Sequence, residues 1–141
     1  MRAAPLEGRS LPEALKTLVD RWEAETGVHT RFKAINGSHP LPPRVELALY
    51  RICQEALTNV ARHARAGRVT VRLVATPEEV QLVVRDDGRG FDPSRVTEER
   101  HGIIGMRERA DTIGGSIKVE SSADSGTRIE VTVPLGGQRD G

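Results

Sequence analysis

The sequence has 141 residues, the length of one domain, and its 21 Lys and Arg against 20 Asp and Glu leave a formal net charge of +1. This balance, with one tryptophan, one tyrosine and two phenylalanines, argues against a dedicated nucleic-acid binder with a basic face or a base-stacking platform. No apolar run approaches the ~18 residues of a membrane span. The single cysteine, Cys53, excludes an internal disulfide and a multi-cysteine zinc site. We therefore expect a soluble α+β or α/β domain from a reducing compartment.

The first helix signal follows an N-terminal segment, residues 1–9, that carries no periodic pattern and is expected to be flexible. Ser10 and Glu13 have the spacing of a capping box. Apolar residues then recur at helical spacing as far as Gly27, a residue that often ends a helix. This pattern predicts a helix over 11–26.

The rest of the chain alternates between one long helix, several short strands and one glycine-rich segment. The long helix is predicted over 44–64, because this stretch has no Gly or Pro and repeats apolar residues every three to four positions. The segment 87–105 is rich in glycine and charge and is expected to be a mobile loop, and 136–141 a disordered tail. The two strands after the long helix should form an antiparallel pair. Strands are predicted over 28–34, 69–75, 80–86, 116–121 and 128–133, and a short helix over 104–113.

Four polar residues of the long helix, Glu55, Asn59, Arg62 and His63, project from one stripe about 100° wide at 100° per residue. A solvated polar face explains such a stripe, although Asn59 is a poor helix former beside apolar neighbours. A carboxylate and a carboxamide at i and i+4 are also oxygen ligands of the kind that hold Mg²⁺ or its waters. The Arg and the His would then take phosphate oxygens. These residues alone leave both interpretations open.

Asp86 ends a predicted strand and is followed by Gly88 and Gly90. A tight Asp-Gly turn explains the first glycine but leaves the second unexplained. The segment is neither a P-loop nor a Rossmann fingerprint, because it lacks the Gly-Lys-Ser/Thr ending and the third glycine that opens a helix. An Asp at a strand end, with glycines that let a ligand approach the backbone, suits an exocyclic amine such as that of adenine. An ordinary turn remains the alternative.

Two further glycine-containing segments stand at the start of an element. Gly102 and Gly105 stand at the start of the short helix, whose first amides would accept an anion, or else they form a hinge before it. Gly126 and Thr127 lead the last strand and are otherwise an ordinary turn.

The order of these segments is more specific than any one of them. An E-x-x-x-N helix, D-x-G-x-G after a strand, a charged loop, G-x-x-G opening a helix and G-T before the last strand resemble the GHKL ATP-binding domain. The segments Arg51–Val60, Arg62–Ala64 and Gly102–Ala110 resemble in particular the catalytic domain of sensor histidine kinases that act with NarL-type response regulators. The resemblance covers residues 10–135, almost the whole chain.

The resemblance implies an α+β fold, a two-layer α/β sandwich of the Bergerat type, in which three helices cover one face of a mixed five-stranded sheet. ATP would lie between the helix 44–64 and the loop 87–105, which acts as a lid. Asn59 would coordinate Mg²⁺ and Glu55 would hold a metal-bound water, which makes both catalytic candidates.

The resemblance also implies roles in nucleotide binding for residues of every motif. Arg62 and His63 would meet phosphate or ribose, and Asp86 would accept a hydrogen bond from the adenine amino group, with Thr127 acting through a water. The glycines would permit close packing of the base, hinge the lid and present amides to the phosphates. The expected nucleotide contacts are Asn59, Arg62, His63, Asp86, Gly88, Gly90, Gly102, Ile103, Gly105 and Thr127.

The sequence departs from the family pattern in three ways. Asp87 stands where Asn is more usual, and Arg100 where a further glycine is common. The phosphoacceptor histidine of these kinases is followed by an acidic residue, whereas the four histidines here are followed by Thr, Pro, Ala and Gly. We therefore expect a catalytic domain that transfers the γ-phosphoryl group of ATP to a histidine on a separate dimerisation and phosphoacceptor domain.

The resemblance implies ATP and Mg²⁺ as cofactors, the kinase's own helical phosphoacceptor domain as direct partner, and a NarL-type response regulator as indirect partner. It implies no nucleic acid, no direct membrane contact and a cytoplasmic domain, and leaves open whether the parent protein is membrane-anchored. Three alternatives share the nucleotide site: an ATP-driven clamp, an anti-sigma-factor serine kinase, and a binding module without transfer activity. Clamps need large following domains, the segment Gly102–Ala110 fits the serine kinases poorly, and Glu55 with Asn59 argues against an inactive module.

Overall fold

The computed structural model describes residues 6, 8–35, 41–90, 98–122 and 125–135. The elements in chain order are α1 (Leu11–Thr26), β1 (His29–Ile35), α2 (Pro43–Asn59), the π-helical turn η1 (Val60–Ala64), β2 (Arg68–Ala75), β3 (Glu79–Asp86), α3 (Glu98–Thr112), β4 (Ser116–Ser122) and β5 (Gly126–Pro134).

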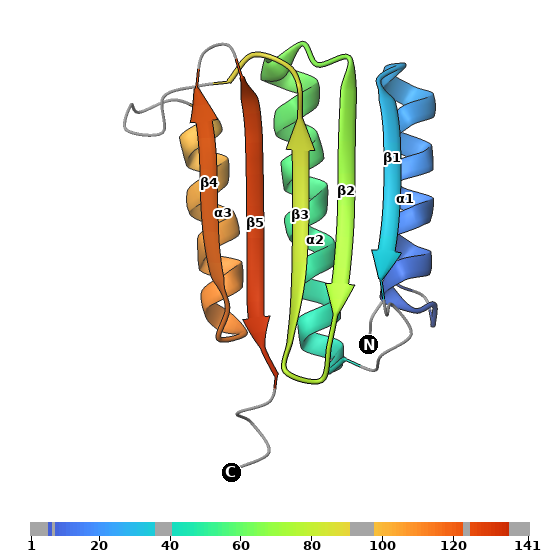
Figure 1. The fold of residues 1–141 in the computed structure, drawn as a ribbon, viewed down its shortest axis with the longest axis vertical. Helices are drawn as coiled ribbons and strands as arrows, with labels where there is room; N and C mark the ends of the chain where they lie inside the picture. The colour runs from blue at the N-terminus through green and yellow to red at the C-terminus, as the bar shows by residue number, and fades with distance from the viewer. Residues whose placement is uncertain (1–5, 7, 36–40, 91–97, 123–124, 136–141) are drawn as a thin grey trace.

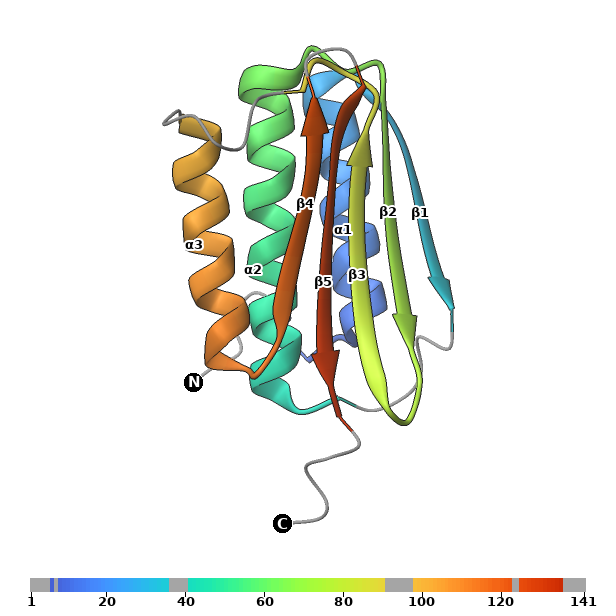
Figure 2. The same ribbon diagram turned by 60° about the vertical axis from the view of Figure 1, so that its left-hand side comes forward.

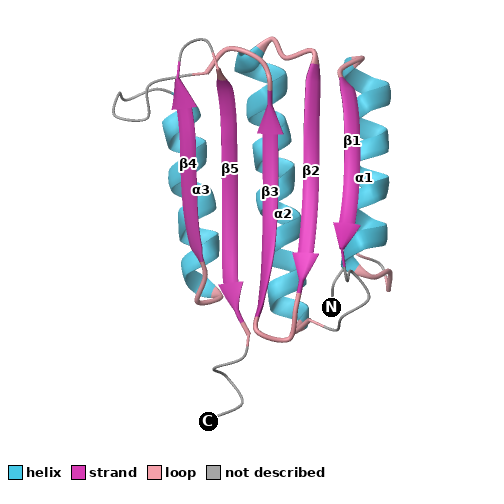
Figure 3. Cartoon of the chain, viewed as in Figure 1, coloured by secondary structure: helices cyan, strands magenta, loops and turns pink. Residues whose placement is uncertain are grey.

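The chain forms two layers, a sheet and a row of helices on one face of it (Figures 1 and 2). The sheet has five strands in the order β1-β2-β3-β5-β4. β1 and β2 are parallel, and the other neighbours pair antiparallel. Figure 3 shows α1, α2 and α3 together behind the strands, with the opposite face of the sheet uncovered. The predicted mixed sheet with three helices on one face is therefore confirmed.

The first helix has the bounds that its capping signals predict. The Ser10 hydroxyl accepts a hydrogen bond from the Glu13 amide at 3.3 Å, and the Glu13 carboxylate accepts one from the Ser10 amide at 3.0 Å. Gly27 ends the helix with a φ of 77°, a left-handed conformation that favours glycine. A cap of this kind stabilises a helix by about 1 kcal/mol.

The core lies between the two layers. Side chains on the inner face of β2, β3 and β5 meet the apolar stripes of the helices, and a buried side chain of this size contributes about 1.5–3 kcal/mol. Completely or almost completely buried members include Leu49, Ile52, Leu73, Leu82 and Val131. Along the strands, buried residues of the inner face alternate with exposed, mostly polar residues of the outer face, as expected of a sheet covered on one side.

Two helix boundaries differ from the prediction. The long helix changes from α-helical to π-helical geometry after Asn59, so the angular spacing of 100° per residue does not extend to Arg62 and His63. The last helix begins at Glu98 and not near 104. A loop over 98–105 was therefore the wrong prediction. Of the rest of the expected lid, residues 87–90 are irregular as predicted, and residues 91–97 lie outside the described residues.

The predicted flexible segment, residues 1–9, is described only at residues 6, 8 and 9. There Leu6 is buried in the core and its carbonyl oxygen accepts a hydrogen bond from the Arg9 amide at 2.9 Å. β5 starts at Gly126, two residues earlier than predicted, because its first residues pair with the end of β3 and with β4. The predicted tail, 136–141, lies outside the described residues.

Candidate nucleotide-binding site

A cleft of about 660 Å³ opens between α2 and α3, within the size range of small-molecule sites. The two helices lie side by side in Figure 2. α3 runs along most of α2, from Gly102 beside Asn59 to Thr112, whose carbonyl oxygen accepts a hydrogen bond from Arg44 at 3.3 Å. The described residues that line the cleft are Glu55, Asn59, Arg62, His101, Gly102, Gly105, Glu108, Arg109 and Thr112.

The half-buried side chains of Glu55 and Asn59 lie directly against the backbone of α3 at Gly102. A Cβ atom on Gly102 would come within 2.8 Å of Asn59 Nδ2 and 3.2 Å of Glu55 Oε2, closer than ordinary van der Waals contact. A Cβ on Gly105, by contrast, would meet nothing within 4 Å and would enter the open part of the cleft. Glycine at 102 therefore permits close approach, and glycine at 105 leaves space for a ligand.

The charges around the cleft suit a metal–phosphate ligand. Arg62 and Arg109 supply guanidinium groups, which match phosphate oxygens bidentately. Glu55 and Asn59 supply hard oxygen donors on adjacent helical turns, the ligand type that Mg²⁺ prefers. No group of three or more His, Cys, Asp or Glu that would hold a metal occurs among the described residues. The donor set thus fits Mg²⁺ in the mode in which one or two protein ligands and substrate phosphates complete the coordination.

Asp86 lies at the end of β3 and follows the buried apolar residues Val80, Leu82 and Val84 on the inner face of the sheet. It is 5% exposed, and no other charged residue is buried among those that the structure describes. Burial raises the pKa of its carboxyl group, and hydrogen bonds from the amides of Gly88 and Thr127 oppose that rise. The Gly88 amide donates to Asp86 Oδ1 at 2.9 Å. A buried carboxylate with few partners is a strong acceptor for an N–H group of a ligand.

The start of β5 packs tightly on Asp86. Gly126 has a φ of 76°, and a Cβ there would come within 2.1 Å of the Asp86 carbonyl oxygen. Its neighbour Thr127 pairs with Asp86 in the strand register, and its hydroxyl lies 2.8 Å from Ser121 Oγ. A Cβ on Gly90 would clash with the Gly126 carbonyl oxygen at 2.7 Å. Only glycines fit this backbone crossing, which fixes the surroundings of the Asp86 carboxylate.

Asp87 ties the end of β3 to the start of β2. Its Oδ1 accepts hydrogen bonds from the amides of Gly67 and Arg68, both at 2.9 Å. The Arg68 amide is the main cause of a lowered pKa of the Asp87 carboxyl group. The acidic residue at this family position therefore has a structural role outside the cleft.

The predicted site residues fall into two groups. Glu55, Asn59, Arg62, Gly102 and Gly105 meet in the cleft. Asp86, Gly88, Gly90 and Thr127 meet at the end of β3 and the start of β5. Of the two remaining predictions, Ile103 is 7% exposed and packs in the core, and the side chain of His63 lies outside the description.

The prediction missed four cleft residues on α3 and one at the sheet end. His101, Glu108, Arg109 and Thr112 share a helix face with Gly105, and their spacing of three to four residues is visible in the sequence. Because the helix was expected to start at 104, His101 was not placed on this face. Ser121 carried no sequence signal, because its contact depends on the pairing of β4 with β5.

A comparison with protein families identifies the family of the chain. Residues 44–137 match the family of histidine kinase-, DNA gyrase B-, and HSP90-like ATPases, and this range contains both groups of site residues. The chain belongs to this family. Membership of this family implies that the domain binds ATP.

Curated relatives of the family domain are sensor kinases. The chain is 38% identical to the sensor histidine kinase LiaS of Bacillus subtilis over 96% of its own length and 37% of LiaS. It is 33% identical to the histidine-protein kinase/phosphatase DegS of Brevibacillus brevis, over 96% of this chain and 35% of DegS. It is 36% identical to the sensor protein VraS of Staphylococcus haemolyticus, over 99% of this chain and 40% of VraS. The chain thus spans little more than a third of the length of these relatives.

A solved structure agrees with the fold. The histidine kinase domain of a blue-light activated kinase from Erythrobacter litoralis superposes with a TM-score of 0.70 at 20% identity, over 93% of this chain and 64% of that one. That structure supports the fold. The family match and the curated relatives identify the domain as similar to the ATP-binding catalytic domain of sensor histidine kinases, and the clamp and serine-kinase alternatives are not favoured. Among the described residues, no helix has the length and apolar character needed to cross a membrane.

Proposed function

We propose that this domain binds ATP with Mg²⁺ and transfers the γ-phosphoryl group to a histidine of a separate dimerisation and phosphoacceptor domain. The observation that carries the proposal is the approach of Gly102 on α3 to Asn59 and Glu55 on α2, which brings two separate motifs to one cleft. The relatives named above, whose names describe them as sensor proteins or histidine kinases, support the same reaction.

Adenine recognition is assigned to the buried carboxylate of Asp86. An exocyclic amino group can donate to this carboxylate, whereas the carbonyl oxygen that guanine carries at that position would face a second acceptor. Burial strengthens the preference, because an unmatched acceptor in a dry site costs about 1–3 kcal/mol. Thr127, whose hydroxyl is close to Ser121, lies opposite Asp86 in the register and completes this wall of the site.

Phosphate and metal binding are assigned to the cleft. Asn59 would hold Mg²⁺ and Glu55 a metal-bound water, and the ion would neutralise charge on the phosphates. Arg62 and Arg109 line the same cleft and would bind phosphate oxygens. Phosphoryl transfer depends chiefly on positioning and charge neutralisation, so these residues need only hold the γ-phosphoryl group in line with the acceptor. A closed cleft would also exclude water as a competing acceptor.

The partners follow from the proposed reaction. The direct acceptor is the helical dimerisation domain of the parent kinase, and a response regulator, of the NarL type, receives the phosphoryl group in turn. Such a relay places the domain in the cytoplasm, where its nucleotide is found.

Transfer of label from γ-labelled ATP to the separately supplied dimerisation domain tests the proposal. We expect an acid-labile, alkali-stable product, as for phosphohistidine, and its loss with the variant Asn59→Asp. An acid-stable, alkali-labile product would indicate a serine kinase. ATP hydrolysis without any labelled acceptor would indicate an ATPase, and either result would contradict the proposal.

A further inference from the structure

The part of the uncovered face formed by β1, β2 and β3 carries five exposed basic side chains that the nucleotide site does not use. Successive side chains of a strand point to opposite faces, and the inner positions of β2 and β3 are buried. The exposed positions therefore share the outer face. We call this set the basic face: Arg31 and Lys33 on β1, Arg68 and Arg72 on β2, and Arg85 on β3.

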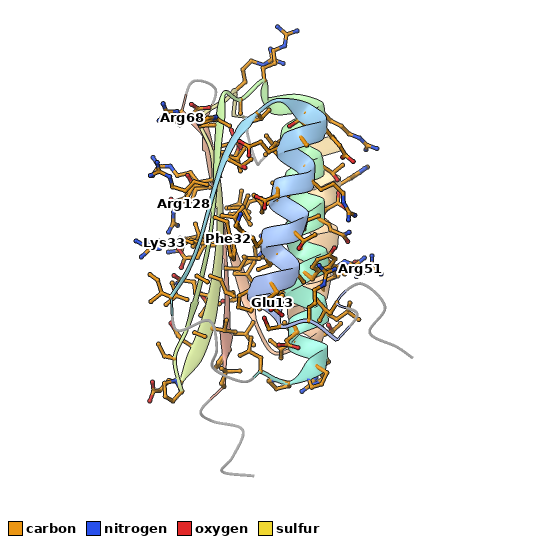
Figure 4. The ribbon with its side chains drawn as sticks, turned by 90° about the vertical axis from the view of Figure 1, so that its right-hand side faces the viewer. Glu13, Phe32, Lys33, Arg51, Arg68 and Arg128 are labelled. Carbon is orange, nitrogen blue, oxygen red and sulfur yellow. The ribbon has the colours of Figure 1, made fainter. Side chains whose placement is uncertain are left out.

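Side-chain directions in Figure 4 agree with this assignment. Lys33 and Arg68 project from the sheet on the side away from the helices, whereas Phe32 points between the layers. Arg51, which belongs to the helix layer, projects from the opposite side of the molecule. The basic face and the ATP cleft therefore lie on different sides of the sheet.

The strand register brings these cations close together. Lys33 is directly opposite Arg72, and Thr70 is opposite both Arg31 and Arg85. Directly paired residues such as Lys33 and Arg72 have Cβ atoms roughly 5 Å apart. Arg31 and Arg85, by contrast, are separated by the strand that carries Thr70. Like charges that face each other destabilise a sheet. The fold therefore carries a repulsion that an external anion would relieve.

The opposite edge of the sheet handles its charge differently. Arg128 on β5 forms an ion pair with Glu130 at 2.6 Å and lies 4.0 Å from Glu120 on β4. Within the described part of the chain, no ion pair of this kind is formed by Arg31, Lys33, Arg72 or Arg85. The formal net charge of +1 thus hides a segregation of unneutralised cations over β1, β2 and β3.

We propose that the basic face is a docking surface for a carboxylate-rich surface of a partner protein. Four of its five members are Arg, whose planar guanidinium group matches carboxylates bidentately. Complementary charge would steer such a partner and fix its orientation on the sheet. This proposal does not depend on the phosphotransfer reaction.

Other observations argue for a compact acidic patch over other anionic partners. Glu120 and Glu130 lie on the same outer face and would repel a uniformly anionic plane such as a bilayer. Among the described residues, the large apolar side chain that is exposed is that of Ile104, which lies on α3. The basic face therefore offers no exposed large apolar side chain that could insert into lipid. None of the described aromatic residues (Trp22, Phe32, Tyr50) belongs to the basic face, which leaves no stacking platform for bases.

An oligo-glutamate peptide is a suitable probe, titrated into the protein at about 0.15 M salt, where long-range attraction is screened within ~8 Å. We expect amide chemical-shift changes at β1, β2 and β3. The triple variant Arg31→Gln/Lys33→Gln/Arg72→Gln should bind the peptide about tenfold more weakly, because it loses three partly exposed charge pairs. The matched control Lys16→Gln/Arg21→Gln/Arg51→Gln, which removes the same charge from exposed helix positions, should bind like wild type.

Fold and alternatives are checked in the same series. All three proteins should bind a non-hydrolysable ATP analogue with equal affinity, because the substitutions lie outside the cleft; if the triple variant fails this check, the double variant Lys33→Gln/Arg72→Gln replaces it. The proposal is overturned if the peptide leaves the amides of the basic face unshifted, or if both triple variants lose binding equally. It is also overturned if phosphatidylglycerol vesicles, duplex DNA or a second copy of the chain occupies this face more tightly than the peptide.

Discussion

The substitution Gly126→Ala tests how tightly β5 packs on the Asp86 backbone. A Cβ at this position would lie 2.1 Å from the Asp86 carbonyl oxygen and 3.0 Å from the carbonyl carbon. Ordinary contact begins near 3.4 Å, so the two strands would have to separate locally by ~1 Å. Overpacking of this kind costs about 1–3 kcal/mol. The left-handed φ of 76° adds about 1–2 kcal/mol for any residue with a side chain.

Gly114→Ala is the matched control for the backbone strain alone. Gly114 has nearly the same φ, 74°, but a Cβ there would meet nothing within 4 Å. It should therefore lose about 1–2 kcal/mol of unfolding free energy, against about 2–5 kcal/mol for Gly126→Ala. For a domain with a typical stability of ~5–15 kcal/mol, both variants should still fold.

Urea denaturation followed by circular dichroism measures both losses. ATP affinity by isothermal titration adds a second comparison, because displacement of the Asp86 backbone should weaken binding in Gly126→Ala and not in Gly114→Ala. Equal loss of stability in the two variants would refute the close packing of β5 on β3. A larger loss of stability without any change in ATP affinity would refute the role of this crossing in the adenine site.

Three further substitutions address the site residues individually. Asp86→Asn should weaken ATP binding by about tenfold or more, because it loses a charge-assisted hydrogen bond of ~1.5–3 kcal/mol. Equal affinity of the wild-type protein for ATP and GTP would argue against the role of Asp86 in adenine recognition. Because burial raises the pKa of Asp86, its ionised form disfavours folding at neutral pH, and thermal melts at pH 7 should show Asp86→Asn no less stable than wild type. Asn59→Asp should abolish the Mg²⁺-dependent part of ATP binding in titration calorimetry while the circular dichroism spectrum stays unchanged. The pKa of Asp87 is lowered in the folded protein, so ionised Asp87 stabilises the fold above the ordinary Asp pKa. This stabilisation is lost as the pH falls through the lowered pKa. In acid titrations the free energy of unfolding of Asp87→Ala should therefore fall less over that pH range than that of the wild type.

Sequence reasoning succeeded where a local signal coincides with a physical requirement. The capping box at Ser10 and the left-handed Gly27 fix both ends of α1. Alternation in the strands predicted which residues face the core. The Asp-x-Gly-x-Gly pattern singled out Asp86, which is buried at the end of β3, and its contact with a nucleotide stays a prediction.

Sequence reasoning failed where geometry depends on other elements. The first turn of α3 is polar, and the apolar period that would have announced it starts only at Ile103. The π-helical turn after Asn59 has no distinctive composition. The contact of Ser121 with Thr127 and the cluster of cations on the outer face both arise from strand pairing across distant segments, which a charge sum over the sequence cannot show.

The central claim is that one ATP molecule occupies the α2–α3 cleft and reaches the end of β3. Amide chemical-shift mapping with a non-hydrolysable ATP analogue and Mg²⁺ tests it most directly. The account predicts the largest changes at Asn59, Gly102 and Gly105 on the helices, and at Gly88 and Thr127 beside Asp86. A separate cavity is lined by Leu6 and Arg44, among other residues. Chemical-shift changes confined to that cavity or to the outer face of the sheet would contradict the claim.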